Sequence, residues 1–495
     1  MGKESGDDSM RSIWKLTAVL GCLLIAAIVV VACSSSSSTP ASGMGKVSVM
    51  VSDPATCQAP GGPYSAVWVT ITDVKANVSA TASDTDSGWV DLTPNLSKTP
   101  MQINLLGQAS NQCFLATLGD ALELQAGTYQ QIRLMLAPNT ATVTGNKCGN
   151  AANCVMLTSD PATPHPLLLS SEAQTGIKIP SGQIASGGFT IAAGQTKDLD
   201  IDFLTCESIV QEGNMQQGNV QFRLKPVLHA AEVKTTAVSV NGKVVDATGK
   251  PVAGAMVALE QPSGTDANGN PIDRILQSTS TASDGTWVIC PLVVGDTSKP
   301  YDVVVTGSSS GILFAPSIVT GVNIGSAVGT VALNASATAT TAALSTATIT
   351  GQVTSVSSGS TGVAIDAYLS VLETINKVDY TILLPTTGTQ TGGSNMLVTT
   401  TNASQTPACN PATAYCINYT LQTQASGAYI GMWSSSGATL NQPNPVPVYL
   451  VDGNATVTGS TTSPDCSPAE KISSAITLAG SPLAGTANLA FTGCS

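Results

Sequence analysis

The sequence predicts an all-β protein made of three β-sandwich modules in series, after an apolar N-terminal segment and a serine-rich tether. Short runs of alternating Val, Ile, Leu and Thr, broken by Gly, Pro, Asn and Asp, recur along the 495 residues, which is the pattern of strands and turns. No stretch after Cys33 keeps the period of about 3.6 residues that marks an amphipathic helix. Only 10% of the residues are charged and the mean hydropathy is +0.22, whereas disordered chains combine low hydropathy with high net charge.

The net charge of −12 restricts the partners of the protein. Binding to nucleic-acid phosphates needs clustered Lys and Arg. The two most basic stretches, QQIRLML and QFRLKPVL, read as strands whose charges point outward. We therefore expect no nucleic-acid partner.

The N-terminal segment has the features of an export signal. Residues 16–32 are uncharged and mostly apolar, slightly long for a signal-peptide core and barely long enough to span a bilayer. The residues before them carry three cations and three acids, an unusual balance for a signal peptide. A start at Met10 would give MRSIWK, with two cations and no acid. The true start, Met1 or Met10, stays open.

The stretch that ends this segment, Val30-Val31-Ala32-Cys33, resembles the bacterial lipobox. The resemblance implies a lipoprotein signal peptide (1–32), a lipidated Cys33, and a flexible tether that together with Cys33 spans 33–45. Two or three acyl chains hold a protein stably on a membrane. The alternative is an uncleaved signal anchor with an incidental cysteine. Ser34 after the cysteine favours, by resemblance to Gram-negative lipoproteins, a place on the outer membrane, facing the periplasm or the cell exterior.

The cysteines are even in number once the N-terminal segment is set aside. Twelve cysteines become ten without Cys22 and Cys33, and an exported protein can form disulfides. Cys206 and Cys290 fall in different modules and either pair or stay as buried thiols. The other eight form candidate disulfides: Cys57–Cys113, Cys148–Cys154, Cys409–Cys416 and Cys466–Cys494.

The first module is predicted to span 46–233. Its stretches VWVTITDVKANV, LGDALELQAGTYQQIRLMLAP and GIKIPSGQIASGGFTIAAGQTKDLDIDFLTCESIVQEGN resemble the bacterial domain-of-unknown-function family 4382. The resemblance implies a β-rich exported domain without an assigned activity. The insertion around Cys148 and Cys154 departs from the family pattern and sits where a binding loop could lie. Tyr129 comes just before a strand, like the corner tyrosines whose hydroxyl caps nearby backbone.

The second module is predicted to span 237–334. VSVNGKVVDATGKPVAGAMVAL, STSTASDGTWVICPL and PYDVVVTG resemble the carboxypeptidase regulatory-like domain, which implies a small transthyretin-type β-sandwich. Asp284-Gly285 supplies a tight hairpin turn. The loop SGTDANGNPIDR is longer than the family pattern needs.

The third module (348–495) follows a linker at 335–347 and reads as a diverged copy of the second. TITGQVTSVSSGSTGVAIDAYLSV follows the outline of SVNGKVVDATGKPVAGAMVAL, and PVYLVDG follows YDVVVTG. QASGAYIGM is matched to TASDGTWVI, and the two tails correspond as well. We therefore expect a second regulatory-like sandwich.

Several sequence patterns resemble catalytic or metal-binding motifs, but each lacks a residue or a structural element that the motif requires. Residues 307–311 fit G-x-S-x-G, but both histidines precede this motif and no helix follows it. Asp198, Asp200 and Asp202 alternate along a strand and read as a solvated face. The stretch from Asp266 to Asp273 evokes a calcium loop but has Pro271 where glycine is required, so turn chemistry explains it.

The remaining candidate residues are His165, His229 and four tryptophans. Neither histidine has a clustered partner in the sequence, so both are expected to be structural or surface residues. Trp68, Trp89, Trp287 and Trp433 could stack on sugars if exposed; the interpretation we prefer is that they anchor the cores.

These observations predict a non-enzymatic, membrane-anchored surface lipoprotein with a structural or adhesive role, with a surface protein or a glycan as partner. We expect no catalytic, cofactor-binding or metal-binding residue. The alternative is a carbohydrate-binding lipoprotein, and a third hypothesis is an enzyme with an unrecognised site. The ligand, the membrane face and the oligomeric state stay open.

Overall fold

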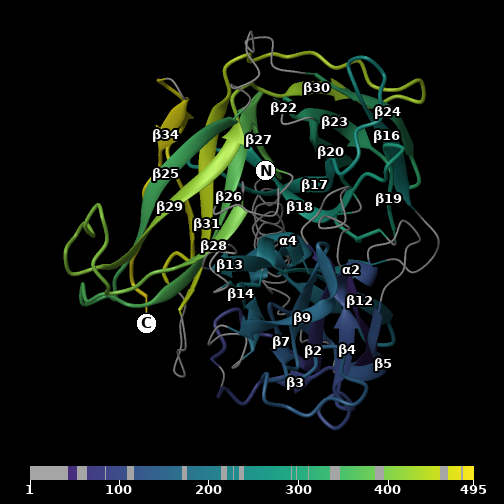
Figure 1. Ribbon diagram of the computed structural model, residues 1–495, viewed down its shortest axis with the longest axis vertical. Coiled ribbons are helices and arrows are strands. Elements are labelled where there is room, and N and C mark those ends of the chain that lie inside the picture. Colours follow the sequence, from purple (N-terminus) through teal and green to yellow (C-terminus); the bar gives the residue numbers. More distant parts are fainter. Residues whose placement is uncertain are drawn as a thin grey trace, which may run out of the picture. The chain divides into compact units, whose positions relative to one another are not determined.

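Strands make up nearly all of the regular structure in the computed structural model of the chain (Figure 1). The structure describes residues 43–494 except 53–63, 84, 109–115, 170–175, 204, 213–219, 227, 234–238, 291, 297, 310–311, 335–345, 385–394, 458–465 and 481–482. Cys33, the signal segment, the tether up to residue 42, and Cys57 and Cys113 lie outside these residues. The last two residues assigned to the tether, Met44 and Gly45, belong to the first strand. Within them, the helices α2 (Leu105–Gln108) and α4 (Thr205–Ser208) have four residues each, and no helix is long and apolar enough to cross a membrane. The all-β prediction is confirmed.

The first sequence region folds around one apolar core built from two main sheets. One sheet has the order β15-β12-β1-β5, and the other runs β10-β7-β2-β8-β9-β14-β13 with β3 and β4 paired to β2. The shared core collects the inward residues of both sheets, among them Val49, Ile71 and Phe203. The strands are β1 (Met44–Ser52), β2 (Tyr64–Asn77), β3 (Val90–Asp91), β4 (Met101–Asn104), β5 (Ala116–Gln125), β6 (Gly127–Tyr129), β7 (Gln131–Leu136), β8 (Cys154–Leu157), β9 (Asp160–Leu169), β10 (Ile177–Ile179), β11 (Phe189–Ile191), β12 (Thr196–Phe203), β13 (Ile209–Glu212), β14 (Gln221–Leu224) and β15 (Leu228–Val233), with 3-10 turns η2 (Ser181–Gln183) and η3 (Ala185–Gly187).

Tyr129 has the predicted role at a corner of this region. Its hydroxyl donates to the backbone oxygen of Gln125 at 2.9 Å, and its ring is buried in the core. The prediction from the sequence is confirmed. The hydroxyl caps the backbone between β5 and β7 while the ring adds apolar contact area.

The second region packs a small sheet, β19-β16-β24, against strands β17, β18, β20 and β23 of a larger sheet. Its strands are β16 (Val240–Asp246), β17 (Met256–Thr265), β18 (Pro271–Ser280), β19 (Thr286–Ile289), β20 (Tyr301–Thr306), β21 (Ser308–Ser309), β22 (Ile312–Leu313), β23 (Ser317–Val322) and β24 (Ala327–Leu333). Gly285 has a φ of +79°, and a Cβ there would lie 2.3 Å from the backbone oxygen of Val244. The predicted Asp284-Gly285 turn therefore requires glycine.

The third region repeats this pairing scheme. β25 pairs antiparallel with β29 and parallel with β34 and β35, as β16 does with β19 and β24. β26 lies between β27 and β31 in the sheet, as β17 lies between β20 and β18. Its strands are β25 (Thr346–Ser355), β26 (Ile365–Ile375), β27 (Val378–Thr381), β28 (Asn395–Thr399), β29 (Tyr415–Gln424), β30 (Tyr429–Met432), β31 (Val448–Val457), β32 (Glu470–Ile472), β33 (Ile476–Thr477), β34 (Ala484–Thr486) and β35 (Leu489–Phe491).

One strand correspondence in the predicted repeat is wrong. QASGAYIGM was matched to the segment that contains β19, yet its strand β30 does not pair with β25. Instead β30 pairs in parallel with β23 of the second region, and β29 takes the place next to β25. A four-residue strand carries too little pattern to choose its neighbour, so tertiary packing decides the pairing.

The second and third regions share one continuous sheet. β18 and β27 lie side by side in parallel, with Ile272 opposite Asp379 and Asp273 opposite Tyr380 (Figure 1). A separate apolar cluster, which includes Met256, Ile318 and Ile382, covers this shared sheet. β17 is therefore buried on both faces, which explains its unbroken run MVALEQ of buried residues. We refer to the β18–β27 pairing and the side chains around it as the joint.

Candidate functional site

A cavity of about 210 Å³ with both polar and apolar side chains in its wall opens where the three regions meet. The first region contributes the turns η2 and η3 and the start of β15. The second contributes the β17–β18 hairpin, and the third contributes β26, β27, β31 and β32. The side chains that carry charge or can exchange protons in its wall are His229, Arg274, Tyr368, Asp452 and Glu470.

Arg274 of β18 holds two carboxylates of the third region. Its Nη1 donates to Asp452 Oδ2 at 2.5 Å, its Nη2 donates to Glu470, and its Nε donates to the backbone oxygen of Ser263 at 3.0 Å. The side chain of Asp452 is only 1% exposed, so this ion pair is largely removed from water. Burial alone would lower the pKa of Arg274, but the two carboxylates raise it above its ordinary value. The ionic groups of the cavity are thus already paired across the joint.

His229 lies half-buried in the same wall, with its ring edge-on to Tyr368 at a centroid distance of 6.0 Å. Burial, together with the charge of Arg274, lowers the pKa of His229 to about 4. The imidazole is therefore neutral at pH 7, and its Nδ1 has no hydrogen-bond partner. His165 packs against Phe222 with ring centroids 5.6 Å apart. The sequence predicted structural or surface roles for both, and gave no signal that His229 lines a cavity.

Three carboxyl groups meet inside the shared sheet, outside the cavity wall. Glu260 of β17 and Asp273 of β18 are fully buried, and Asp302 of β20 pairs with Glu260 across the strands. Burial, a hydrogen bond to Asp302 and repulsion by its charge raise the pKa of Asp273 to about 9. Burial and the charge of Asp273 raise the pKa of Glu260 as well. The pKa of Asp273 thus lies above neutral pH, which favours its protonated form beside Asp302.

The three aspartates of β12 do not form a solvated face. Asp200 and Asp202 are buried, and Asp198 is half-buried. Ser52 of β1 donates to Asp200 Oδ2 at 2.7 Å, and burial raises the pKa of Asp200 to about 7. The prediction was wrong because the alternation of polar residues does not tell a solvated strand face from one that packs against other residues.

The loop from Asp266 has the turn chemistry that its composition predicts. Asp266 Oδ1 accepts from the backbone N–H groups of Asn268 and Asn270, both at 2.8 Å. Asp273, from the same stretch, instead lies in the buried carboxyl group described above. The described part of the G-x-S-x-G stretch, 307–309, leads into the short strand β21 and not into a helix.

Three of the four candidate disulfides can be checked, and all three are present: Cys148–Cys154, Cys409–Cys416 and Cys466–Cys494. Cys290 is also disulfide-bonded. This favours the paired alternative for Cys290 over a free thiol.

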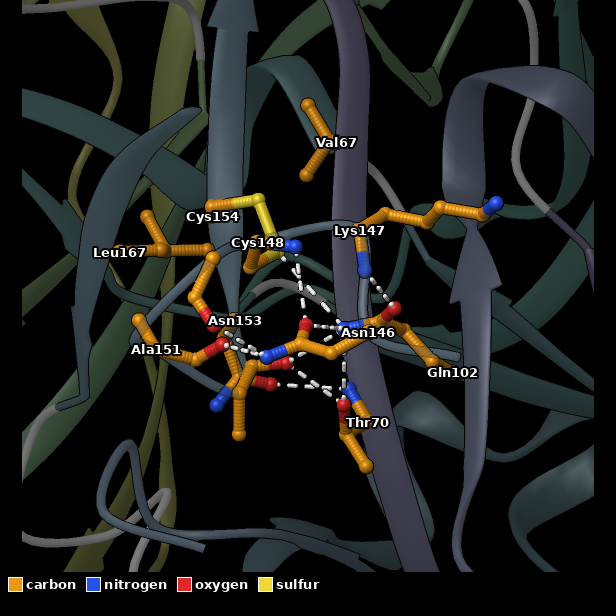
Figure 2. The surroundings of a disulfide bond; sticks show 12 residues. Val67, Thr70, Gln102, Asn146, Lys147, Cys148, Ala151, Asn153, Cys154 and Leu167 are labelled. Carbon is orange, nitrogen blue, oxygen red and sulfur yellow. Dashed lines mark hydrogen bonds between the residues drawn. A yellow bond between two sulfur atoms is a disulfide. The ribbon is translucent and has the colours of Figure 1, made fainter. Parts of the chain in front are cut away.

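The loop closed by Cys148–Cys154 is fixed by side-chain amides (Figure 2). Gln102 donates to Asn146 Oδ1 at 2.9 Å and to the backbone oxygen of Ala152 at 3.0 Å. Asn146 donates in turn to the backbone oxygen of Ala151 at 2.8 Å. Backbone groups that a loop would leave unpaired are thus bonded, so the loop is held in one shape.

Asn153 ties this loop to β2. Its Oδ1 accepts from the backbone N–H of Thr70 at 2.8 Å, and its Nδ2 donates to the backbone oxygen of Ala137 at 2.9 Å. The side chain of Asn153 is fully buried. The loop that the sequence marked as a candidate binding loop is therefore a rigid extension of the sheet.

None of the four tryptophans in the described part of the chain is fully exposed. Trp287 is buried, and Trp68 and Trp433 pack against apolar clusters. Arg133 covers the ring of Trp89, with Cζ 4.7 Å from the ring centroid. Among the described residues, the large hydrophobic side chains that are exposed are all aliphatic.

Comparison with known proteins identifies one domain. Residues 44–226 match the family described as "Domain of unknown function (DUF4382)", which agrees with the resemblance seen in the sequence. No curated protein sequence matches the chain.

Solved structures show only weak similarity. A streptococcal ancillary pilin is 10% identical, with 90% of this chain and 99% of that chain covered and a TM-score of 0.14. The TIE protein of Bacillus anthracis is 8% identical, with 91% and 50% covered and a TM-score of 0.13, so this chain spans half of its length. The minor pilin GBS52 of Streptococcus agalactiae is 11% identical, with 51% and 95% covered and a TM-score of 0.15. Superpositions this poor carry no argument about fold or function.

Proposed function

We propose that this protein is a non-enzymatic, lipid-anchored surface protein of the bacterial envelope, with a structural or adhesive role. The observation that carries the proposal is the joint. Arg274 binds two carboxylates across it, and the pairings β18–β27 and β23–β30 join two sandwiches into one sheet. A chain of sandwiches joined by flexible linkers would bend under load, whereas a shared sheet with an apolar cover resists bending.

The export features of the chain support this location. The lipobox-like stretch at Cys33 provides a site for acyl chains, and three disulfides stabilise the described loops. Disulfides persist in compartments outside the cytosol. The serine-rich tether between Cys33 and the first strand would give the modules reach above the membrane.

The chemistry of the cavity supports a non-enzymatic role. A general base needs a free lone pair and a pKa near the working pH. Asp452 and Glu470 are engaged by Arg274, and the pKa of His229, at about 4, makes it a weak base. Glu260 and Asp273, whose pKa values are raised, are buried inside the sheet, away from the cavity wall. Burial and the charge of Asp452 also raise the pKa of Glu470 in the wall, but its carboxylate is bound by Arg274.

The test is a deletion strain of the native bacterium complemented with wild-type protein, Cys33→Ser or the control Ser34→Ala. We expect wild type and Ser34→Ala to incorporate labelled palmitate, to remain with the membrane fraction, and to restore attachment of cells to surfaces or resistance of the envelope to detergent. Cys33→Ser is expected to lose the label and the restored property.

Two results would overturn the proposal. A deletion strain that matches its parent in both attachment and detergent resistance would remove the structural or adhesive role. Full activity of Cys33→Ser, released from the membrane, would remove the need for the anchor.

A further inference from the structure

The loop between β17 and β18 lies against a carboxylate of the third region. Asp266 is buried in this loop with 6% of its surface exposed. Its Oδ1 is bonded to the loop backbone as described, and its Oδ2 accepts from the side-chain amides of Asn268 and Asn270 at 3.1 and 3.0 Å. Asn268 is exposed and Asn270 half-buried, so the loop has a polar rim open to water above a buried carboxylate.

Asp379 of β27 supplies a second carboxylate. It stands opposite Ile272 in the β18–β27 register and is fully buried. Thr374 donates to its Oδ1 at 2.6 Å, whereas its Oδ2 has no hydrogen-bond partner. Its carboxyl group is within hydrogen-bond range of that of Asp266. Burial and the charge of Asp266 raise the pKa of Asp379.

The two carboxyl groups differ in their hydrogen bonds. Asp266 accepts from two backbone N–H groups and from two side-chain amides. Asp379 accepts from Thr374 through Oδ1, whereas its buried Oδ2 has no hydrogen-bond partner. An unsatisfied buried oxygen costs about 1–3 kcal/mol, so this arrangement calls for a cation or a shared proton.

We propose that Asp266, Asn268, Asn270 and Asp379 form a calcium site that bridges the second and third regions. Rotating each asparagine amide by half a turn replaces its NH₂ group with its oxygen, which a calcium ion would favour. The four residues then present carboxylate and amide oxygens, the ligands that Ca²⁺ prefers, and water on the open side completes a shell of about six to eight.

This site explains why the sequence pattern alone is incomplete. The spacing Asp266-x-Asn268-x-Asn270 has ligands at alternate positions, as calcium loops do, but Pro271 and Gln277 stand where such a loop needs glycine and a bidentate glutamate. The missing carboxylate comes from Asp379, more than a hundred residues later, through the β18–β27 pairing. The proposal does not depend on the proposed function.

The experiment uses the full chain in nonionic detergent, stripped with EDTA and titrated with CaCl₂ by calorimetry, with thermal unfolding measured in parallel. We expect one Ca²⁺ per chain, with a Kd on the order of 10⁻⁴–10⁻³ M as in extracellular modules, and a higher Tm in calcium. Asp379→Asn should weaken binding by at least about tenfold, since one ligand charge is lost.

The Tm of Asp379→Asn relative to wild type should also change sign between EDTA and calcium, which the loss of a purely structural residue would not cause. In EDTA it should unfold at the same temperature as wild type or higher, because one of two facing carboxylates is neutralised. In 10 mM CaCl₂, about ten times the expected Kd or more, it should unfold at a lower temperature than wild type.

The matched control is Asp246→Asn. Asp246 Oδ1 also accepts from loop backbone, at 2.9 Å from Thr248 N and 3.0 Å from Lys250 N, and this variant should bind calcium like wild type. The absence of binding heat and of a Tm shift in folded wild-type protein would overturn the proposal in favour of a shared proton. Equal calcium affinity of wild type and Asp379→Asn would overturn it too.

Discussion

The disulfide loop of the first region and the joint between the second and third regions both contain many polar side chains that are shielded from water. The two places differ in the partners that these side chains find. In the loop, neutral amides of Gln102, Asn146 and Asn153 bond to backbone groups in complementary donor–acceptor pairs. In the joint, carboxyl groups face other carboxyl groups, as Asp273 faces Asp302. The loop is therefore complete by itself, whereas the joint depends on protons, on Arg274 and, by our proposal, on a cation.

This difference has a consequence for how each part responds to its surroundings. Amides do not titrate, so the stability that they contribute should be constant with pH. Buried carboxyl groups bind protons more tightly in the folded than in the unfolded chain, so their contribution depends on pH. The stability that the joint contributes should therefore depend on the pH of the medium.

Removing Arg274 from the joint is expected to cause the largest change in the free energy of unfolding. Arg274→Met would leave Asp452, 1% exposed, and Glu470 without their counter-charge. Breaking a buried ion pair by removing one partner costs about 3–5 kcal/mol. We expect a loss of unfolding free energy at the low end of this range, because Glu470 is partly exposed, measured by urea denaturation at pH 7.

The control for this prediction is Lys250→Met, an exposed cation of the same region, which should change stability by less than about 0.5 kcal/mol. If the two variants were equally stable, Arg274 would not hold the joint together.

Asp273→Asn should increase the free energy of unfolding, whereas Arg274→Met should decrease it. The ordinary pKa of Asp273 is 3.8 and its pKa in the folded chain is about 9, so the folded state binds the extra proton between these values. Wild-type stability therefore falls as pH rises from about 4 to 9, and the penalty is complete above pH 9. The variant removes this penalty and should be more stable than wild type at pH 9, on the order of 3 kcal/mol.

Urea denaturation at pH 5, 7 and 9 measures this difference. Asp246→Asn serves as a control, because the pKa of Asp246 is lowered by hydrogen bonds from Thr248 and Lys250 and does not change its charge in this range. Identical pH slopes for wild type and Asp273→Asn would show that Asp273 is ionised throughout.

The features that the sequence could predict are those that depend on residues close to one another in the chain. The all-β class, the hydroxyl contact of Tyr129 and the disulfide Cys148–Cys154 depend on patterns or residues close in the chain, and these were predicted. The joint depends on β18 meeting β27, about a hundred residues away. β18 contains Asp273 and β27 contains Asp379, which a strand pattern alone would assign to solvent. Both are buried where the two modules pair.

The candidate site was hidden for the same reason. His229 and Asp452 have unremarkable neighbours in sequence, and only the convergence of three regions puts both in one cavity. Asp266 was visible as a loop residue, but Asp379 was not visible as its partner. A long-range polar contact leaves no periodic signal in a single sequence.

Asn153→Ala tests the other side of the comparison and should have the smallest effect of the three variants. It would leave the backbone N–H of Thr70 and the backbone oxygen of Ala137 unpaired inside the first region. Unsatisfied buried groups cost about 1–3 kcal/mol each, and solvent that enters the space left by the side chain offsets part of this cost. We expect a loss of about 2 kcal/mol, with the exposed Asn95→Ala as the neutral control. Because no titrating group is involved, the loss should be equal at pH 5 and pH 9. A loss that changed with pH would mean that the amide network depends on a carboxyl group after all, and the contrast between the loop and the joint would fail.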